Sequence, residues 1–396
     1  PVFCDDNYTP DVKDGFAWGE EINWKVYSST VFEDDYPAVV DFQTGSGLVY
    51  NNKWYPSGLS IAEDVDAYNG QNLIIPQGWS GISSHLIPSS SSITEMMSPI
   101  IDELVIIQTL TKMYYPDAGV NTLGVWSSHQ GFKIKVDQEV TLPFLGCPET
   151  DKTVDLNATW NIFPVLSECS VQTSELFNPI LNDLIMIKEI AGVNVFWPDA
   201  GIGSLSMLEP GKAYMAAVSS NTSITFQDCN QAKSGAVNNP ASFVNETPWA
   251  TPAFTSSSHT VAVTKTALYN LQLGDYIGAF NASGVCAGLA QIQNTDQPLA
   301  LTLFGDDAST VASDGYSEDE PIILKVYRHD TDEQFETSVS FDPFMPSSTG
   351  TFTENGLSAI SSLKLSSTGL NEFSNGSFTF YPNPSSGTVH MIAPAD

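Results

Sequence analysis

Carboxylate side chains gather at two places where they could bind a metal ion. The first group is Asp306, Asp307, Asp314 and Glu318, and the second, with nearly the same spacing, is Asp5, Asp6, Asp14 and Glu20. Hard oxygen ligands at this density suit Ca²⁺. The spacing differs from that of an EF-hand loop, and Asp-Gly is by itself a turn signal. The sequence therefore favours solvated acidic turns at both places, with calcium sites as the alternative.

Four aromatic residues could form a platform on which a sugar ring stacks: Trp126, Trp197, Tyr114 and Tyr115. Tyr114-Tyr115 recurs later in the chain as Phe196-Trp197, which favours packing in the core or between repeats over sugar binding. Trp126 has Leu208 at its place in the repeat, so the repeat does not explain it. A carbohydrate-binding module is therefore one alternative for function.

No residue pattern in the sequence points to catalysis. The five histidines (His85, His129, His259, His329 and His390) have no HExxH or other paired spacing, which argues against a metalloprotease. GxSxG, a P-loop and a GxGxxG that follows a strand are also missing from the sequence. We therefore expect no enzyme active site and no cofactor within these residues. The alternative is a catalytic domain ahead of residue 1, in which case the chain would be the C-terminal accessory region of a large secreted hydrolase.

Five cysteines, at positions 4, 147, 169, 229 and 286, form an odd set without CxxC spacing, which argues against a zinc site. Cys147 and Cys169 flank the junction of two sequence repeats, and we predict a disulfide between them. Such a bridge would contribute about 3 kcal/mol by loop-closure entropy. The alternative is two buried thiols.

The elements that must position these residues belong to an internal repeat. Tyr115-Pro116-Asp117-Ala118-Gly119 returns 82 residues later as Trp197-Pro198-Asp199-Ala200-Gly201. The match extends over about eighty residues and includes Trp79, which returns as Trp160. Two copies of one unit therefore lie side by side in the middle of the chain.

A second correspondence joins the two outer parts of the chain at an offset near 300. Lys25-Val26-Tyr27 matches Lys325-Val326-Tyr327, and Gly58-Leu59-Ser60 matches Gly356-Leu357-Ser358. The first 66 residues thus correspond to the back half of a module that is complete at about 246 to 366. We expect residue 1 to lie inside a domain of a longer protein.

Short apolar or alternating runs, separated by Gly, Asn, Asp and Pro, predict an all-β fold. Phe132 to Val136 alternates as a half-buried strand should, and Leu104 to Ile107 is apolar throughout, as in a strand buried on both faces. Short helical turns are expected at 93–97 and 174–177. The predicted architecture is a row of β-sandwich-like modules around the duplicated repeat.

The charge excludes some partners. The chain has 14 basic and 46 acidic residues, which gives a formal charge of −32. A surface this acidic repels phosphate backbones. We therefore expect no nucleic-acid partner. No run of 18 apolar residues exists, so no membrane span is expected either. The acidic surface suits a protein that stays soluble outside the cell.

The end of the chain resembles a known export signal. Tyr381-Pro382-Asn383-Pro384 follows a strand-like stretch, and Gly387 precedes another. This pattern resembles the opening of the type A C-terminal sorting domain, carried by proteins that the type IX secretion system exports. The family's domain continues for several more strands, so the pattern here is incomplete. The central repeats and the module beside them also resemble parts of large secreted proteins of Bacteroidota.

These observations divide the chain and suggest its role. The expected parts are half of a β-sandwich module (1–66), two central repeats (71–148 and 149–228), a linker (229–245), a complete β-sandwich module (246–366), a second linker (367–376) and the start of a sorting domain (377–396). The resemblance implies a secreted protein of the outer cell surface that meets the type IX machinery. We expect a structural or adhesive role, with partners among other surface proteins, copies of itself or extracellular polysaccharide.

Overall fold

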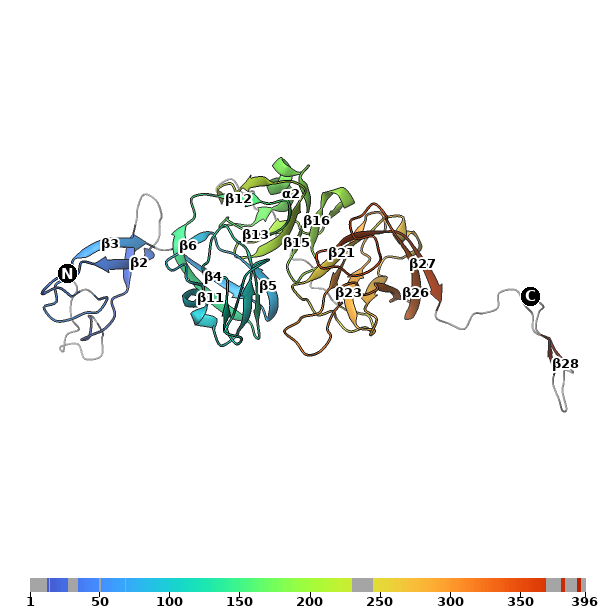
Figure 1. Ribbon diagram of the computed structural model, residues 1–396, viewed down its shortest axis with the longest axis horizontal. Coiled ribbons are helices and arrows are strands. Elements are labelled where there is room, and N and C mark those ends of the chain that lie inside the picture. The colour runs from blue at the N-terminus through green and yellow to red at the C-terminus, as the bar shows by residue number, and fades with distance from the viewer. Residues whose placement is uncertain are drawn as a thin grey trace. The chain divides into compact units, whose positions relative to one another are not determined.

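The computed structural model describes residues 13, 15–27, 35–49, 51–67, 69–229, 245–367, 379–381 and 390–392. The predicted all-β class is confirmed, since strands form several antiparallel sheets and helices are few and short (Figure 1). The chain divides into two compact units. Unit 1 contains residues 1–242 and 254–257, and unit 2 contains residues 243–253 and 258–396.

Unit 1 begins with a small antiparallel sheet. Its strands, in spatial order, are β1 (Trp24–Tyr27), β2 (Asp35–Phe42) and β3 (Ala62–Ala67). The next strand, β4 (Asn69–Ile75), begins two residues after β3 ends, so the connection to the central repeats is short.

Both central repeats contain a five-stranded sheet with the same strand order. In the first repeat the order is β5 (Gly78–Ile82), β10 (Phe132–Val136), β7 (Leu104–Gln108), β8 (Met113–Tyr115) and β9 (Val120–Asn121). In the second it is β13 (Thr159–Pro164), β19 (Ala213–Val218), β15 (Leu184–Glu189), β16 (Val195–Trp197) and β17 (Ile202–Gly203). The duplication read from the sequence is therefore also a duplication of topology.

Smaller sheets and one helical turn close each repeat. The first has the sheet β4, β11 (Val140–Pro148) and β6 (Leu86–Pro88), with helix α1 (Ile93–Met97). The second has the pairs β12 (Thr153–Leu156) with β20 (Thr222–Thr225) and β14 (Val171–Gln172) with β18 (Met207–Leu208), with helix α2 (Thr173–Phe177). The second residue after each helix is a proline, Pro99 or Pro179. It lies in a 3₁₀ turn that follows the helix, because proline cannot continue an α-helix.

Unit 2 contains one seven-stranded sheet. Its order is β23 (Cys286–Gln291), β22 (Tyr276–Phe280), β25 (Ile323–Arg328), β26 (Glu333–Phe341), β27 (Leu357–Ser367), β21 (Ser258–Val263) and β24 (Leu299–Phe304). Apolar side chains from β21, β22 and β24 share one core with those from β25 and β27. The buried carboxylate of Asp275 is paired with Arg328 through two hydrogen bonds of 3.1 and 3.0 Å.

The final described strands are β28 (Thr379–Tyr381) and β29 (His390–Ile392), which pair antiparallel with Tyr381 opposite His390. The other residues of the predicted sorting motif, Pro382, Asn383, Pro384 and Gly387, lie outside the described residues. The resemblance to a sorting domain stays a prediction.

Candidate functional site

The two central repeats contact each other through strands of their five-stranded sheets. We call this contact the seam and define it by Gly81 of β5 with Ala213 of β19, and by Gly131, which precedes β10, with Ile162 of β13. A Cβ atom added to Gly81 would lie 2.2 Å from the carbonyl oxygen of Ala213. One added to Gly131 would lie 2.7 Å from the Ile162 side chain. Glycine is needed at both places because the backbones approach so closely.

The contacts across the seam join equivalent pairs of strands from the two repeats in a symmetrical way. Strand β5 corresponds to β13 in the repeat, and β10 corresponds to β19, because each pair occupies the same place in its sheet. The contacts join β5 to β19 and β10 to β13. In a two-fold symmetric dimer, element i of one copy contacts element j of the other, and j of the first contacts i of the second. The contacts between the two repeats follow this isologous pattern. The two repeats therefore form a pseudo-dimer within one chain.

Hydrogen bonds reinforce the seam. Ser83 donates its hydroxyl to the backbone carbonyl of Lys212 over 2.6 Å, and its oxygen accepts the backbone N–H of Val165 over 3.0 Å. The backbone N–H of Ser83 donates to Gly211 over 2.9 Å. Because Ser83 is fully buried, these bonds also satisfy polar groups that burial would otherwise leave unpaired.

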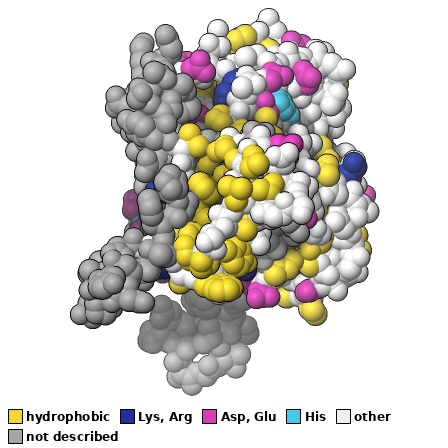
Figure 2. All heavy atoms as spheres, turned by 90° about the vertical axis from the view of Figure 1, so that its left-hand side faces the viewer, with side chains coloured by type: hydrophobic (Ala, Val, Ile, Leu, Met, Phe, Trp, Pro, Cys, Tyr) yellow, Lys and Arg dark blue, Asp and Glu magenta, His cyan; other side chains and the backbone are white. Residues whose placement is uncertain are grey.

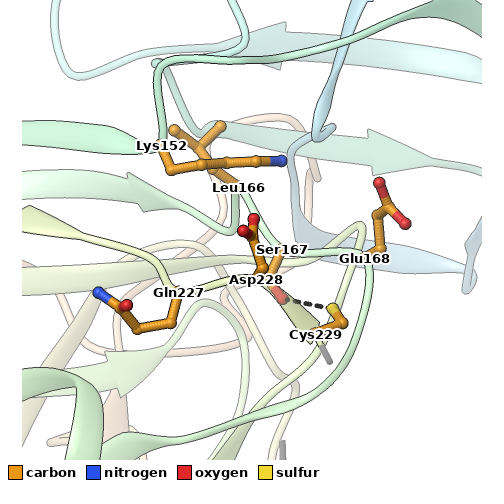
Figure 3. Close-up of a pocket in the computed structure, with 7 residues that line it drawn as sticks. All are labelled: Lys152, Leu166, Ser167, Glu168, Gln227, Asp228 and Cys229. Atoms are coloured by element: carbon orange, nitrogen blue, oxygen red, sulfur yellow. Dashed lines mark hydrogen bonds between the residues drawn. The ribbon is translucent and has the colours of Figure 1, made fainter. Parts of the chain in front are cut away.

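A small polar cavity opens beside the disulfide of the second repeat (Figure 3). It has a volume of about 200 Å³ and is lined by Lys152, Leu166, Ser167, Glu168, Gln227, Asp228 and Cys229. Figure 3 shows that the polar ends of Gln227 and Glu168 point away from each other. Ser167 donates its hydroxyl to the carbonyl of Cys169 over 2.8 Å, so this hydroxyl serves the local backbone. Sites for organic ligands usually have about 300 Å³ or more, so this cavity suits a few waters or a small ion.

The disulfide corrects the predicted pairing. Cys169 is bonded to Cys229, with the two Cα atoms 5.9 Å apart, and the predicted bond between Cys147 and Cys169 is wrong. Cys147 lies in β11, whose pairing with β6 places it opposite Ile87. Cys229 instead follows β20, which pairs with β12 and brings the chain back past Lys152. The sequence alone does not show that β20 pairs with β12, so it could not identify Cys229 as the partner of Cys169.

His85 lies near the cavity and is almost fully buried. Burial lowers the pKa of its imidazole from the ordinary value of 6.5, while Glu168 raises it and Lys152 lowers it further. Its Nδ1 atom has no hydrogen-bond partner among the described residues. The imidazole is therefore neutral at pH 7.

A serine, a histidine and a carboxylate also meet in the first repeat. Ser128 donates its hydroxyl directly to Glu149 over 2.6 Å, and Nε2 of His129 lies 3.0 Å from the backbone carbonyl of Asp151. In a catalytic triad the histidine stands between the serine and the carboxylate. Here the serine hydroxyl contacts both the carboxylate of Glu149, over 2.6 Å, and Nδ1 of His129, over 3.2 Å, so the histidine does not stand between the other two.

The acidic loop of unit 2 uses its carboxylates as backbone acceptors. The carboxylate of Asp314 accepts a hydrogen bond from the backbone N–H of Asp307 over 3.0 Å. The carboxylate of Asp306 accepts one from the backbone N–H of Asp314 over 2.9 Å. Glu318 instead accepts the backbone N–H of Glu354 over 3.0 Å. No group of three or more His, Cys, Asp or Glu in the described chain is arranged to hold a metal ion. Calcium at this loop stays an alternative from the sequence.

The second acidic group is mostly outside the described residues, which omit Asp5, Asp6 and Asp14. Glu20 is described. Its carboxylate accepts a hydrogen bond from the ammonium of Lys13 and another, over 2.7 Å, from the backbone N–H of Ala17. The bond from Lys13 lowers the pKa of the Glu20 carboxyl.

The aromatic platform does not form. Trp126 is only 3% exposed and stacks on Phe132, with the ring centres 4.3 Å apart, and Trp197 is also 3% exposed. Tyr114 and Tyr115 are half-buried in β8. Trp126 therefore fills the core of the first repeat, and neither tryptophan offers a ring face to a sugar.

The chain shows no significant match to a protein-family model, to a curated protein or to a solved structure. Among the described helices, none is long and apolar enough to cross a membrane.

Proposed function

We propose that this protein is a non-catalytic, secreted protein of the outer cell surface whose β-modules build a structural or adhesive fibre. The observation that carries this proposal is the seam, in which two copies of one module pack backbone to backbone. An enzyme commonly uses the junction of two domains as its binding cleft. In this chain the junction is filled by Ser83, Ile162 and Ala213.

The chemistry of the described side chains also favours assembly over catalysis. Burial raises the pKa of the Cys286 thiol to about 11, which suppresses the thiolate that a nucleophile needs. The hydroxyls of Ser128 and Ser167 are held by Glu149 and by a backbone carbonyl.

A place outside the cell is supported by the disulfide, since such bonds persist in oxidising compartments. The formal charge of −32 adds to this, because it keeps extended surfaces soluble. The resemblance of Tyr381 to Gly387 to a sorting signal supports type IX export. Burial of Trp126 and Trp197 favours protein partners, including further copies of the chain, over polysaccharide.

Electron microscopy of material extracted from the native cell surface tests the proposal. We expect filaments that an antibody against residues 71–228 labels at regular intervals. A strain that lacks the gene should lose these filaments and serves as the control. Isolated particles that carry a separate globular mass and hydrolyse a surface polymer would contradict the proposal and favour the accessory region of a hydrolase.

A further inference from the structure

An exposed tryptophan lies at the edge of a pocket in the N-terminal segment. Figure 2 shows hydrophobic side chains gathered on one face of the molecule, so exposure of an apolar side chain does not by itself mark a site. Trp18 differs because it is 78% exposed and its ring lies close to a second aromatic ring. The ring centres of Trp18 and Tyr55 are 6.3 Å apart, and the ring planes meet at 81°. The two rings therefore form a corner, with Trp18 facing solvent.

The pocket beside this corner is lined by Leu48, Val49, Asn51 and Tyr55. Its volume of about 330 Å³ is in the range of sites for small organic ligands. Oδ1 of Asn51 accepts the backbone N–H of Lys53 over 3.2 Å, which orients the amide. Among the described residues Nδ2 of Asn51 has no hydrogen-bond partner, so it can donate to a ligand. The pocket thus offers apolar side chains, an aromatic ring and an amide donor.

Backbone hydrogen bonds hold together the two loops that carry these residues. The backbone N–H of Gly19 donates to the carbonyl of Trp54 over 2.9 Å, and the N–H of Trp54 donates to the carbonyl of Glu20 over 2.8 Å. Trp18 and Tyr55 are the chain neighbours of these bonded residues. The backbone therefore fixes the two rings side by side.

Unit 2 contains the same two loops without the aromatic pair. The backbone N–H of Phe352 donates to the carbonyl of Glu320 over 2.8 Å, as the counterpart of the second of these bonds. Counted from this pair, Glu318 and Thr353 take the places of the two aromatic residues. The loops therefore fold without either ring, and the aromatic pair is not needed for their structure.

These positions lie at the surface even in the complete module of unit 2. The strands that precede the loops there, β21 to β24, are described, and so is the stretch 301–312, which corresponds to residues 1–12. With them in place Glu318 is exposed, and so is Thr349, at the place of the pocket amide. The exposure of Trp18 is thus a property of its place in the module and does not depend on the residues that precede it.

The charge of the site narrows the class of ligand. Trp18 and the four lining residues are all uncharged, in a chain with a formal charge of −32. A site without charge favours a neutral ligand. A sugar ring combines an apolar C–H face, which stacks on an aromatic ring, with hydroxyl groups that pair with an amide.

We propose that this corner binds a sugar ring of a neutral extracellular polysaccharide. The C–H face of the ring would stack on the indole of Trp18, and Nδ2 of Asn51 would donate to a hydroxyl of the sugar that enters the pocket beside Tyr55. The buried Trp126 and Trp197 take no part. This inference goes beyond the proposed function and does not rest on it, because a sugar site can serve a protein with or without a fibre.

Affinity electrophoresis of the full chain tests the site, with dextran, mannan, galactan or xylan cast into native gels as the probes. We expect at least one of these neutral polysaccharides to retard the chain. Trp18→Ala and Tyr55→Ala should each raise the dissociation constant about tenfold, because each removes one ring of the corner. Thermal unfolding of Trp18→Ala should match that of the unchanged chain, because the side chain is exposed.

The matched control is Tyr269→Ala, which removes an aromatic side chain that is 87% exposed in unit 2 and should leave the retardation unchanged. The anionic polysaccharide alginate should not retard the chain. Absence of retardation in all the neutral gels would overturn the proposal, as would equal retardation of Trp18→Ala and the unchanged chain. Binding of a proline-rich peptide that Trp18→Ala abolishes, without sugar binding, would also overturn it and assign the pocket to a polypeptide.

Discussion

At the scale of single residues, the bond between Cys169 and Cys229 closes most of the second central repeat into one loop. The two cysteines are 60 residues apart in the sequence. Closing a loop of that length in the unfolded chain should stabilise the fold by about 4 kcal/mol.

We therefore expect Cys229→Ser to lower the free energy of unfolding of unit 1 by about 4 kcal/mol in a urea titration. Cys147→Ser is the matched control and should change it much less, because Cys147 is not in the disulfide. Equal effects of the two variants would refute the assignment.

Trp126 gives a second prediction at this scale. Trp126→Ala should destabilise the first repeat by about 4 kcal/mol, because it empties a core position against Phe132 and Phe144. Trp126→Phe should cost less, because Nε1 has no hydrogen-bond partner in the described structure. Thermal unfolding checks both variants. Full stability of Trp126→Ala, combined with loss of sugar binding, would restore the platform interpretation.

His85 should make stability depend on pH. Because its folded pKa is depressed from 6.5, the unfolded chain binds the proton more readily. Its contribution to stability is therefore present above pH 6.5 and is lost as the pH falls through the folded pKa. We expect the urea midpoint to decrease between pH 7 and pH 5, and His85→Gln to flatten this slope. A slope that is identical in both proteins would exclude His85 as its source.

At the scale of elements, the seam depends on how closely β5 and β19 approach. Gly81 has no room for a side chain, whereas a Cβ on Gly70 of β4 would make only an ordinary contact, 3.6 Å from Leu145. The contrast separates the effect of the seam from the general cost of replacing a strand glycine.

We expect Gly81→Ala to destabilise unit 1 by about 2 kcal/mol, because the added methyl group must displace the backbone at Ala213. Gly70→Ala should be neutral within about 0.5 kcal/mol. Chemical denaturation compares the two variants directly. A seam that tolerates Gly81→Ala as well as Gly70→Ala would be looser than the distances indicate.

At the scale of the whole molecule, the division into two compact units has a thermodynamic consequence. Each unit has hydrophobic clusters of its own, such as that around Phe163 in unit 1 and that around Tyr316 in unit 2. Units of this kind unfold as separate cooperative transitions. We expect two peaks in scanning calorimetry, of which Cys229→Ser lowers only one. A single peak that shifts as a whole would contradict this expectation.

Much of the fold could be predicted because local patterns determine it. Phe132 to Val136 is a strand with the predicted bounds, and the helical turn at Ile93 to Met97 is also confirmed. Apolar alternation and a following proline are local signals, so one sequence suffices to read them.

The residues that depend on long-range pairing could not be predicted. Cys229 finds Cys169 only because β20 pairs with β12, and Trp126 enters the core only because β10 carries Phe132 beneath it. Neither of these two contacts can be predicted from the spacing of the residues along the chain. The seam was missed for the same reason, since Gly81 and Gly131 carry no signal that distinguishes them from turn glycines.

The seam also has an evolutionary consequence. An isologous contact between identical chains must hold the same pair of residues at both of its ends, so any mutation changes both ends together. Once a gene duplication places the two copies in one chain, each end can change alone. Gly81 now faces Ala213 at one end, while Gly131 faces the larger Ile162 at the other. A homodimer could not hold this unequal pair, which is open only to a chain that contains both copies.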